Sequence, residues 1–288
     1  MQFTKTNNYG FAISKHLSWA ILLLFITHLS SYATTPKGNF NLISTIEVKA
    51  SFMTTDFLKN VYVVDKKNVL TKYDSIGTKV GTYTESKYGK LTAIDATSPF
   101  NVLLFYKDYA TLVTTDMKLN TRRLFKLPSI GINNVPVACM SHDNYIWVYD
   151  ADASRLKKID NNYQVIQQSL DLRNVLGEAI TPNYMVERDG LIYLNIPGMG
   201  VIMFDIFGTF YTSVSNTDLN KDDLSAFQVV QQKIMYFSDH YLFVYDLSSQ
   251  QPESVLLPEG MKPRDVRIEK GSLYMLDDDK LQIYAQTK

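Results

Sequence analysis

Short apolar runs alternate with polar turns along most of this chain. In the clearest unit, an apolar segment, Asn60–Asp65, is followed by a polar tight turn and a second segment, Leu70–Asp74. Short runs that are rich in Val, Ile, Tyr and Phe and are bounded by Asn, Asp or Gly predict β-strands. We therefore expect each unit to form a β-hairpin, with aspartates at the ends of its strands.

The same unit returns five more times along the chain. The later copies pair Val102–Tyr106 with Thr111–Asp116, Tyr145–Asp150 with Leu156–Asp160, Leu191–Asn195 with Val201–Asp205, Ile234–Ser238 with Leu242–Asp246, and Leu273–Asp277 with Leu281–Tyr284. The aspartates that close the second strand fall at positions 74, 116, 160, 205 and 246, so the steps are 42, 44, 45 and 41 residues. This period is the size of one four-stranded propeller blade. The second copy is the weakest match.

Two further segments complete each predicted blade. A short apolar segment before the hairpin supplies the innermost strand, as in Leu91–Ile94, Val135–Met140, Tyr184–Val186, Ala226–Val230 and Val266–Ile268. A more polar segment after it supplies the outer strand, as in Val80–Tyr83, Arg123–Leu127, Val165–Leu170, Thr209–Val214 and Ser254–Leu257. The sixth copy has no such segment, so we expect the amino-terminal Leu42–Val48 to complete the last blade and close the ring. The predicted fold class is an all-β, six-bladed β-propeller.

The first copy also carries a family resemblance. Its residues Val61–Asp65, Asn68, Leu70, Tyr73–Asp74 and Gly77 resemble the NHL-type repeat of six-bladed propellers. The other copies keep the order of strands and turns without the Asn and Gly, and are similar to the broader group of NHL, YWTD and TolB-like propellers. The resemblance covers roughly residues 40 to 286 and implies the fold. It implies no active site, because members of that group include binders, receptors and enzymes.

The first 33 residues predict a secretory signal peptide. Lys5 and Lys15 precede an apolar stretch from Leu17 to Leu29, and Ser31 and Ala33 supply the small residues that a signal peptidase reads. An uncleaved membrane anchor is the alternative, although the stretch is shorter than the ~20 residues that span a bilayer. We expect cleavage after Ala33, a single propeller domain over residues 34–288, and a periplasmic, outer-envelope or extracellular location. After cleavage we expect no membrane span.

The charge of the chain limits the kinds of partner it can bind, and its cysteine content limits its disulfide chemistry. Residues 1–33 contain two lysines and no acidic residue, so the remaining chain carries 27 of the 29 basic residues and all 29 acidic ones. Such a nearly neutral protein lacks the broad cationic field that attracts a phosphate backbone, so nucleic acid is not an expected partner. Cys139 is the one cysteine, which excludes an intramolecular disulfide. It lies in the apolar run Val135–Met140 and is interpreted as core packing rather than a reactive thiol.

No constellation of residues predicts catalysis. Ser141, His142 and Asp143 include the residue types of a hydrolase triad, but neighbours in sequence cannot act on one another in that way, so we interpret them as a turn. Two segments have the alternate spacing of a calcium loop, and both lack its glycine and glutamate; they are Asp150, Asp152, Ser154 and Asp218, Asn220, Asp222. These and Asp277–Asp279 are interpreted as polar turns and loops.

A metal on the propeller axis is the main enzymatic alternative. Lactonase-like six-bladed enzymes hold such a metal with carboxylate and amide groups from several blades, and the predicted inner strands here offer Asp95, Glu187, Gln228 and Arg267. This set is a poor oxygen cage, because it contains few carboxylates and one cation. We therefore predict no catalytic residues, no metal and no cofactor, and keep a hydrolase as the alternative.

A binding scaffold is the preferred interpretation. Loops between blades and turns between second and third strands share one face of a propeller, where partners commonly bind. Tyr, Arg and Met are favoured at interfaces, so a protein or peptide partner is expected, with the scaffold itself a monomer. The residues predicted on this face are Lys107, Tyr109, Arg173, Asn195, Met199, His240, Tyr241 and Arg264.

Overall fold

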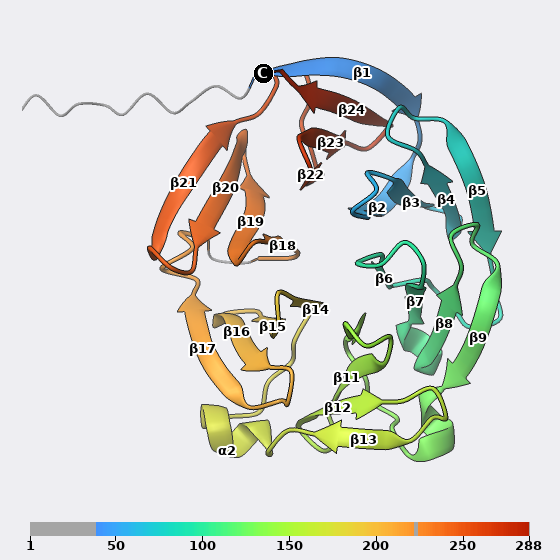
Figure 1. Cartoon of the computed structure of the whole chain (residues 1–288), viewed down its shortest axis with the longest axis vertical. Coiled ribbons are helices and arrows are strands. Elements are labelled where there is room, and N and C mark those ends of the chain that lie inside the picture. Colours follow the sequence, from blue (N-terminus) through green and yellow to red (C-terminus); the bar gives the residue numbers. More distant parts are fainter. Residues whose placement is uncertain (1–38, 222–223, 288) are drawn as a thin grey trace, which may run out of the picture. The chain divides into compact units, whose positions relative to one another are not determined.

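The computed structural model describes residues 39–221 and 224–287. These residues form six four-stranded antiparallel sheets, which are arranged around a common axis (Figure 1). The fold is therefore a six-bladed β-propeller, and the prediction of six repeated units is confirmed. The predicted signal peptide, residues 1–33, lies outside the described residues.

Each blade begins with a strand at the axis and continues with a buried second strand. The innermost strands are β2 (Ala50–Thr55), β6 (Ala93–Asp95), β10 (Ala138–Met140), β14 (Tyr184–Arg188), β18 (Gln228–Val230) and β22 (Asp265–Glu269). The second strands are β3 (Val61–Asp65), β7 (Val102–Tyr106), β11 (Ile146–Asp150), β15 (Leu191–Ile196), β19 (Lys233–Ser238) and β23 (Ser272–Leu276).

The outer half of each blade consists of a third strand and an edge strand. The third strands are β4 (Val69–Tyr73), β8 (Thr111–Thr115), β12 (Arg155–Ile159), β16 (Gly200–Asp205), β20 (Tyr241–Asp246) and β24 (Lys280–Gln286). The edge strands are β5 (Lys79–Thr84), β9 (Thr121–Lys126), β13 (Val165–Gln168), β17 (Phe210–Ser215), β21 (Gln251–Leu256) and β1 (Phe40–Glu47). Among the described residues, three short helices lie in turns and loops, namely η1 (Lys107–Tyr109), η2 (Leu127–Ile130) and α2 (Leu172–Leu176).

The repeated aspartates shape the turns between third and edge strands. We number the blades in chain order of their innermost strands, from β2 (blade 1) to β22 (blade 6). In blades 1 to 4 one carboxylate oxygen of the aspartate accepts hydrogen bonds from the backbone N–H groups two and four residues later, for example Asp205 from Phe207 (2.9 Å) and Thr209 (2.8 Å). The residue three positions after each aspartate has a positive φ. Each repeated aspartate therefore marks a hydrogen-bonded turn between the third and edge strands, a conformation that Asp and Asn side chains favour.

The core is divided among the spaces between blades. Each cluster of buried apolar side chains combines strands of two neighbouring sheets; the one between blades 3 and 4, for example, joins Trp147 and Leu156 to Ile192 and Phe204. The other clusters lie between the remaining pairs of neighbours. Because both faces of the second strands are covered, they read as continuous apolar runs instead of alternating ones. The weakly predicted strand β8 is buried along its whole length.

The sheet of blade 6 combines strands from both ends of the described chain. β1 pairs antiparallel with β24, with Leu42 opposite Tyr284 and Thr45 opposite Gln282. Asn39 and Thr287 are also joined, because the Thr287 N–H donates to the Asn39 carbonyl at 2.9 Å. In Figure 1 the first and last described strands lie side by side.

One inner strand was not predicted, and others begin later than expected. β2 carries mixed residues, Ala-Ser-Phe-Met-Thr-Thr, and has no apolar run to mark it. Within the expected segments 91–94, 135–140 and 226–230, the strands begin only at Ala93, Ala138 and Gln228. The apolar residues before them, such as Leu91 and Val135, are buried parts of the loops between blades. Within the part of the chain that the structure describes, no helix has the length and apolar character needed to cross a bilayer.

Candidate functional site

The innermost strands surround a cavity along the axis. Its volume is about 420 Å³, and its lining runs from Lys107 and Pro197 near the turns between second and third strands to Thr97, Arg188 and Glu269 near the opposite face. We call it the axial cavity. A concave space of this size with a few polar groups is typical of a ligand site.

A second cavity, of about 360 Å³, adjoins the first at the amino-terminal ends of the inner strands. We call it the mouth. It is bordered by residues of blades 1, 2, 4, 5 and 6, including Phe52, Thr92, Tyr184, Arg264 and Asp265. The inter-blade loops lead into these strand ends, so the mouth opens on the face predicted to bind partners.

Arg267 is the central charge of this region. It lines both cavities and is only 6% exposed. Its Nη1 donates to the Phe227 carbonyl at 3.1 Å, and its Nε lies 3.2 Å from Asp265 Oδ1 without a hydrogen-bonding geometry. Nε thus has no hydrogen-bond partner among the described residues. A buried guanidinium is costly unless an opposite charge pairs with it, and Asp265 supplies that charge.

Tyr184 and Asp265 complete the polar surface around Arg267. The charge of Arg267 interacts with both side chains. Burial raises the pKa of Tyr184 and also that of Asp265, so both groups favour their neutral forms more strongly than in water. Neither was predicted as a site residue. The signal was present, since Asp265 and Arg267 are two apart on an inner strand and must face the same side.

All four predicted axial residues connect neighbouring blades, and two of them, Asp95 and Gln228, join inner strands directly. Asp95 Oδ2 accepts from the Met140 N–H at 2.8 Å, joining β6 to β10. Gln228 exchanges hydrogen bonds with both backbone groups of Ile268, at 2.8 and 3.3 Å, joining β18 to β22. Asp265, from outside the predicted set, repeats this pattern with a long contact of 3.4 Å from the Met53 N–H. Inner strands are sheet edges, and these side chains satisfy their free backbone groups.

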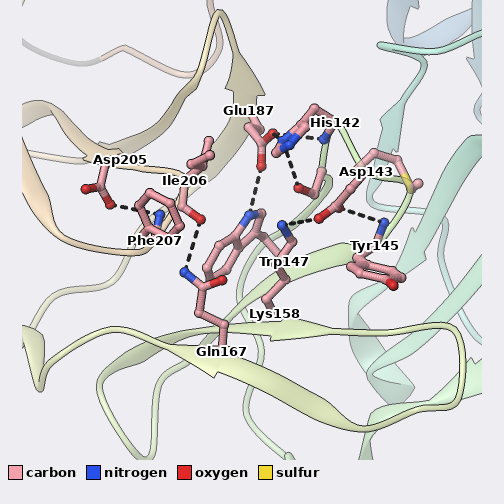
Figure 2. A network of polar contacts seen from close by, with 12 residues as sticks. His142, Asp143, Tyr145, Trp147, Lys158, Gln167, Glu187, Asp205, Ile206 and Phe207 are labelled. Carbon is pink, nitrogen blue, oxygen red and sulfur yellow. Dashed lines mark hydrogen bonds and ion pairs between the residues drawn. The ribbon is translucent and has the colours of Figure 1, made fainter.

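Glu187 connects blades 3 and 4 away from both cavities. Its carboxylate is 2% exposed, and it accepts from the His142 N–H at 2.8 Å and from Trp147 Nε1 at 2.8 Å. Figure 2 shows Glu187 between these two residues, with Lys158 beside Asp143. His142 Nδ1 lies 2.6 Å from the same Glu187 oxygen that receives the His142 N–H. The carboxylate therefore holds the turn of blade 3 against strand β14.

The geometry of Ser141 and His142 does not form a nucleophile–base pair. Ser141 Oγ lies 3.5 Å from His142 Nδ1, the same ring nitrogen that contacts Glu187. In a hydrolase triad the serine and the carboxylate engage opposite ring nitrogens. The three residues Ser141–Asp143 lie in the turn between β10 and β11, where they were predicted.

The segments tested for calcium also lie in turns. Asp150 accepts from the Asp152 N–H and pairs with Lys157 Nζ at 2.6 Å, in the hairpin turn between β11 and β12. Asp218 receives two hydrogen bonds from Ser215 in the loop after β17, and Asp222 lies outside the described residues. Among residues 39–221 and 224–287, no three His, Cys, Asp or Glu side chains gather closely enough to hold a metal ion.

The eight residues predicted on the binding face are spread over blades 2 to 6. Two border the cavities: Lys107 lines the axial cavity and Arg264 lines the mouth. His240 and Tyr241 border a separate hollow beside Leu256–Leu257. Tyr109 is exposed in the turn of blade 2.

The other three make local contacts. Arg173 forms two hydrogen bonds with the carboxylate of Asp171, and this pairing lowers the pKa of Asp171 to about 2. Met199 packs against the core between blades 3 and 4. Asn195 is buried in β15 and donates to Asn183 Oδ1 at 2.6 Å and to the Leu224 carbonyl. Asn195 thus forms hydrogen bonds with both inter-blade loops that flank blade 4.

Solved structures with the same arrangement of strands include lyases and a WD40 domain. A virginiamycin B lyase from Staphylococcus aureus superimposes with a TM-score of 0.61 at 9% identity, covering 86% of this chain and 100% of that one. The WD40 domain of Neurospora crassa Pan2 gives 0.57 at 8% identity, covering 88% and 97%. This chain shares their fold. A catalytically inactive histidine-to-alanine variant of the S. aureus lyase with quinupristin gives 0.55 at 10% identity, covering 86% and 100%.

The predicted resemblance to propellers is therefore confirmed at the level of the fold. No family model matches the sequence, and no curated protein matches it. At such low identity the structural likeness carries no activity to this chain. The chemistry must be argued from the residues around the axis.

Proposed function

We propose that this protein is an exported, non-enzymatic scaffold that binds a protein or peptide partner at the mouth of the axial cavity. The observation that carries the proposal is Arg267, a buried guanidinium that lines both cavities and pairs with Asp265 at 3.2 Å. An acceptor group of the partner would pair with the side of the guanidinium that faces the cavities. A carboxylate matches a guanidinium best, because two parallel hydrogen bonds can form.

Aromatic and polar side chains around the mouth support a peptide ligand. Phe52 and Phe237 supply apolar surface, whereas Tyr184 and Asn183 supply hydrogen-bonding groups. Arg264 is held at the edge by the Ala50 carbonyl and by Asp278 Oδ1 at 3.4 Å. Ligand sites commonly combine such apolar walls with a few fixed polar groups. Lys107 and Arg264 are the two predicted face residues that this proposal uses.

An enzyme remains the second candidate, as a lactonase-like hydrolase with an axial metal or as a lyase. The lyase neighbour has a catalytically inactive histidine-to-alanine variant. In this chain, residues 39–288 include only His142 and His240 as histidines, and neither lines the axial cavity or the mouth. Asp95 and Gln228 are committed to backbone groups of neighbouring blades. These observations favour binding over catalysis.

Crosslinking in the native envelope tests the scaffold. A photoreactive residue at position 225, at the mouth, is expected to give one specific protein adduct. The same residue at position 118, in a turn on the opposite face of blade 2, is the matched control and is expected to give none. Equal adducts at both positions would contradict the proposal. A calcium-dependent rise in melting temperature that is lost in Asp95→Asn would instead favour the metalloenzyme.

The role of the mouth is tested with conservative variants. Tyr184→Phe removes one hydroxyl and Arg264→Ala removes one exposed charge, and both are expected to reduce the adduct from a crosslinker at Lys107. Lys118→Ala, which removes a charge on the other face, is expected to leave the adduct unchanged. Melting temperatures of all three proteins show whether they remain folded. Unchanged adducts in both mouth variants would show that the partner binds elsewhere.

Export follows from the predicted signal peptide. We infer cleavage after Ala33 and a location in the periplasm, on the outer envelope or outside the cell. Amino-terminal sequencing of the protein recovered from envelope and medium fractions is expected to begin at Thr34. Recovery of the uncleaved chain in a membrane fraction would support the anchor instead.

We also infer that β1 closes the ring. Pairing of β1 with β24 supplies the fourth strand of blade 6 and covers an edge that would otherwise be free. Gly77, in a turn of blade 1, packs against Ser44 of β1, so the closing strand also contacts the next blade.

A further inference from the structure

Exposed apolar side chains collect at the outer rim where blades 3 and 4 meet. Leu170 is 72% exposed, Phe207 66% and Tyr211 62%, and Phe210 and Val175 are also exposed. All but Tyr211 border a groove of about 550 Å³. We call these five residues the rim patch. Clustered apolar residues on a surface mark an interaction site more often than single ones do.

The edge strand of blade 4 differs from the other edge strands. β17 consists of Phe-Tyr-Thr-Ser-Val-Ser and contains neither a charged residue nor a proline. β9 contains three basic residues, β21 contains Pro252 and Glu253, β5 begins with Lys79 and β1 ends with Glu47. β13 is uncharged but has only four residues. Charges and prolines at sheet edges prevent pairing with other chains, so β17 is the least protected long edge.

The free side of β17 is accessible for pairing. In the described part of the chain, β17 pairs only with β16. Asp218 caps its far end by accepting from the Ser215 N–H at 3.0 Å. A bulge near Tyr211 interrupts the register with β16, and the regular part begins at Thr212. The edge available to another strand is therefore centred on Thr212–Val214.

We propose that β17 pairs antiparallel with β17 of a second copy of this chain, about a two-fold axis. The two blade-4 sheets would then form one continuous sheet of eight strands. Centred on Ser213, the pairing sets Ser213 opposite its own copy and Thr212 of each copy opposite Val214 of the other. The rim patches of both copies lie at the two ends of the paired strands. A two-fold interface uses the same surface twice, so that surface must be compatible with itself.

The lack of charge on β17 makes the strand compatible with a second copy of itself. No like charges oppose each other when β17 pairs with itself, because the strand carries none. The same pairing through β9 would bring Arg122, Arg123 and Lys126 against their own copies, which is unfavourable. The chain is also nearly neutral overall, so two copies do not repel strongly. This inference is independent of the axial cavity and of any partner bound there.

The mass of the protein in solution tests the proposal. Sedimentation velocity from about 1 to about 100 µM is expected to show a reversible dimer. Ser213→Lys adds a charge at the centre of the free edge and is expected to weaken dimerisation at least tenfold. Thr82→Lys, at an exposed position of the β5 edge, is the matched control and should leave the dimer unchanged. Melting temperatures confirm that both variants fold.

Hydrogen exchange of the unmodified protein gives a second readout that does not depend on a variant. The amides of residues 212–214 are expected to exchange more slowly as the protein concentration rises. A wild-type protein that stays monomeric throughout this range would overturn the proposal and agree with the monomer predicted from the sequence. Equal loss of the dimer in both lysine variants, or in neither, would also overturn it.

Discussion

A single buried carboxylate, Glu187, organises the contact between blades 3 and 4. It receives the backbone N–H of His142 and the indole N–H of Trp147, and its side chain is almost fully buried (Figure 2). An ionised carboxylate has only acceptor oxygens, so it suits a position surrounded by donors. The residue was noted in the sequence as an axial ligand candidate. Its contacts give it a structural role.

Replacing this carboxylate by its amide tests that role. In Glu187→Gln an NH2 group takes the place of one acceptor oxygen and must face a donor from His142 or Trp147. The free energy of unfolding is expected to fall by about 1–3 kcal/mol, the cost of a buried unsatisfied group. Chemical denaturation measures the change. Glu253→Gln, on an exposed edge strand, is the control and should change stability little; equal effects of the two variants would refute this role for Glu187.

Cys139 provides a second test at the level of one side chain. It is fully buried between blades 3 and 4, and burial raises its pKa well above the usual value. Thiol reagents attack the thiolate, so the folded protein is expected not to react at pH 8. Full labelling by iodoacetamide is expected once denaturant unfolds the chain, as measured by mass spectrometry. Rapid labelling of the folded protein would contradict the assigned burial.

The axial residues were only partly predictable from the sequence. Asp95, Gln228 and Arg267 were expected on inner strands, because their strands follow from the repeat. All three line the axial cavity, and the contacts of each depend on which backbone groups lie opposite in the neighbouring blade. Asp95 meets the Met140 N–H, Gln228 meets both groups of Ile268, and Arg267 meets the Phe227 carbonyl. These contacts join residues about 40 positions apart or more, and periodicity within one blade does not report them.

Two glycines at the turn between β15 and β16 of blade 4 differ in how closely they approach strand β17. Gly198 and Gly200 both have positive φ, which side chains disfavour. A Cβ at Gly198 would meet nothing within 4 Å, whereas one at Gly200 would clash with the Val214 carbonyl oxygen of β17. Gly198→Ala is expected to cost about 1 kcal/mol of stability through backbone strain alone. Gly200→Ala adds the clash, for a further 1–3 kcal/mol by order of magnitude.

Thermal and chemical unfolding of both glycine variants measure this difference. Gly200 begins β16 and has a φ of 117° against 83° for Gly198, so added backbone strain and the clash with β17 both contribute to the larger loss expected for Gly200→Ala. Equal losses in the two variants would show that β17 does not pack as closely against the turn as described.

Strands that are covered on both faces were predicted well from the sequence. The second and third strands were predicted to within about one residue at most ends, since continuous apolar runs bounded by aspartate leave little choice. Inner strands were predicted less well, because one side faces the axis and tolerates polar residues, as in Ala50–Thr55. The helix α2 was not predicted, since five residues within a loop carry no period.

The proposed closure of the ring by β1 concerns the whole molecule and can be tested by a crosslink. Thr45 and Gln282 lie opposite each other in β1 and β24, at the separation of paired antiparallel strands. Thr45→Cys with Gln282→Cys is expected to form a disulfide under mild oxidation, with Cys139 too buried to interfere. The bond closes almost the entire chain into a loop and is expected to stabilise it by about 2–5 kcal/mol.

The reduced form of the same protein is the control for this crosslink. Denaturation of oxidised and reduced samples measures the gain directly. Failure to form the bond, while each single-cysteine variant folds normally, would show that β1 does not occupy this position in solution.

The hydrogen bond between Asn39 and Thr287 has a consequence for how the propeller responds to mechanical tension. Both strand ends leave the sheet at the same corner, since Phe40 lies opposite Gln286 in an antiparallel pair. Tension applied between these two ends loads the backbone hydrogen bonds between β1 and β24 one after another, beginning at the end where Phe40 lies opposite Gln286. When the protein is pulled at these two ends, the ring is therefore expected to open first between β1 and β24.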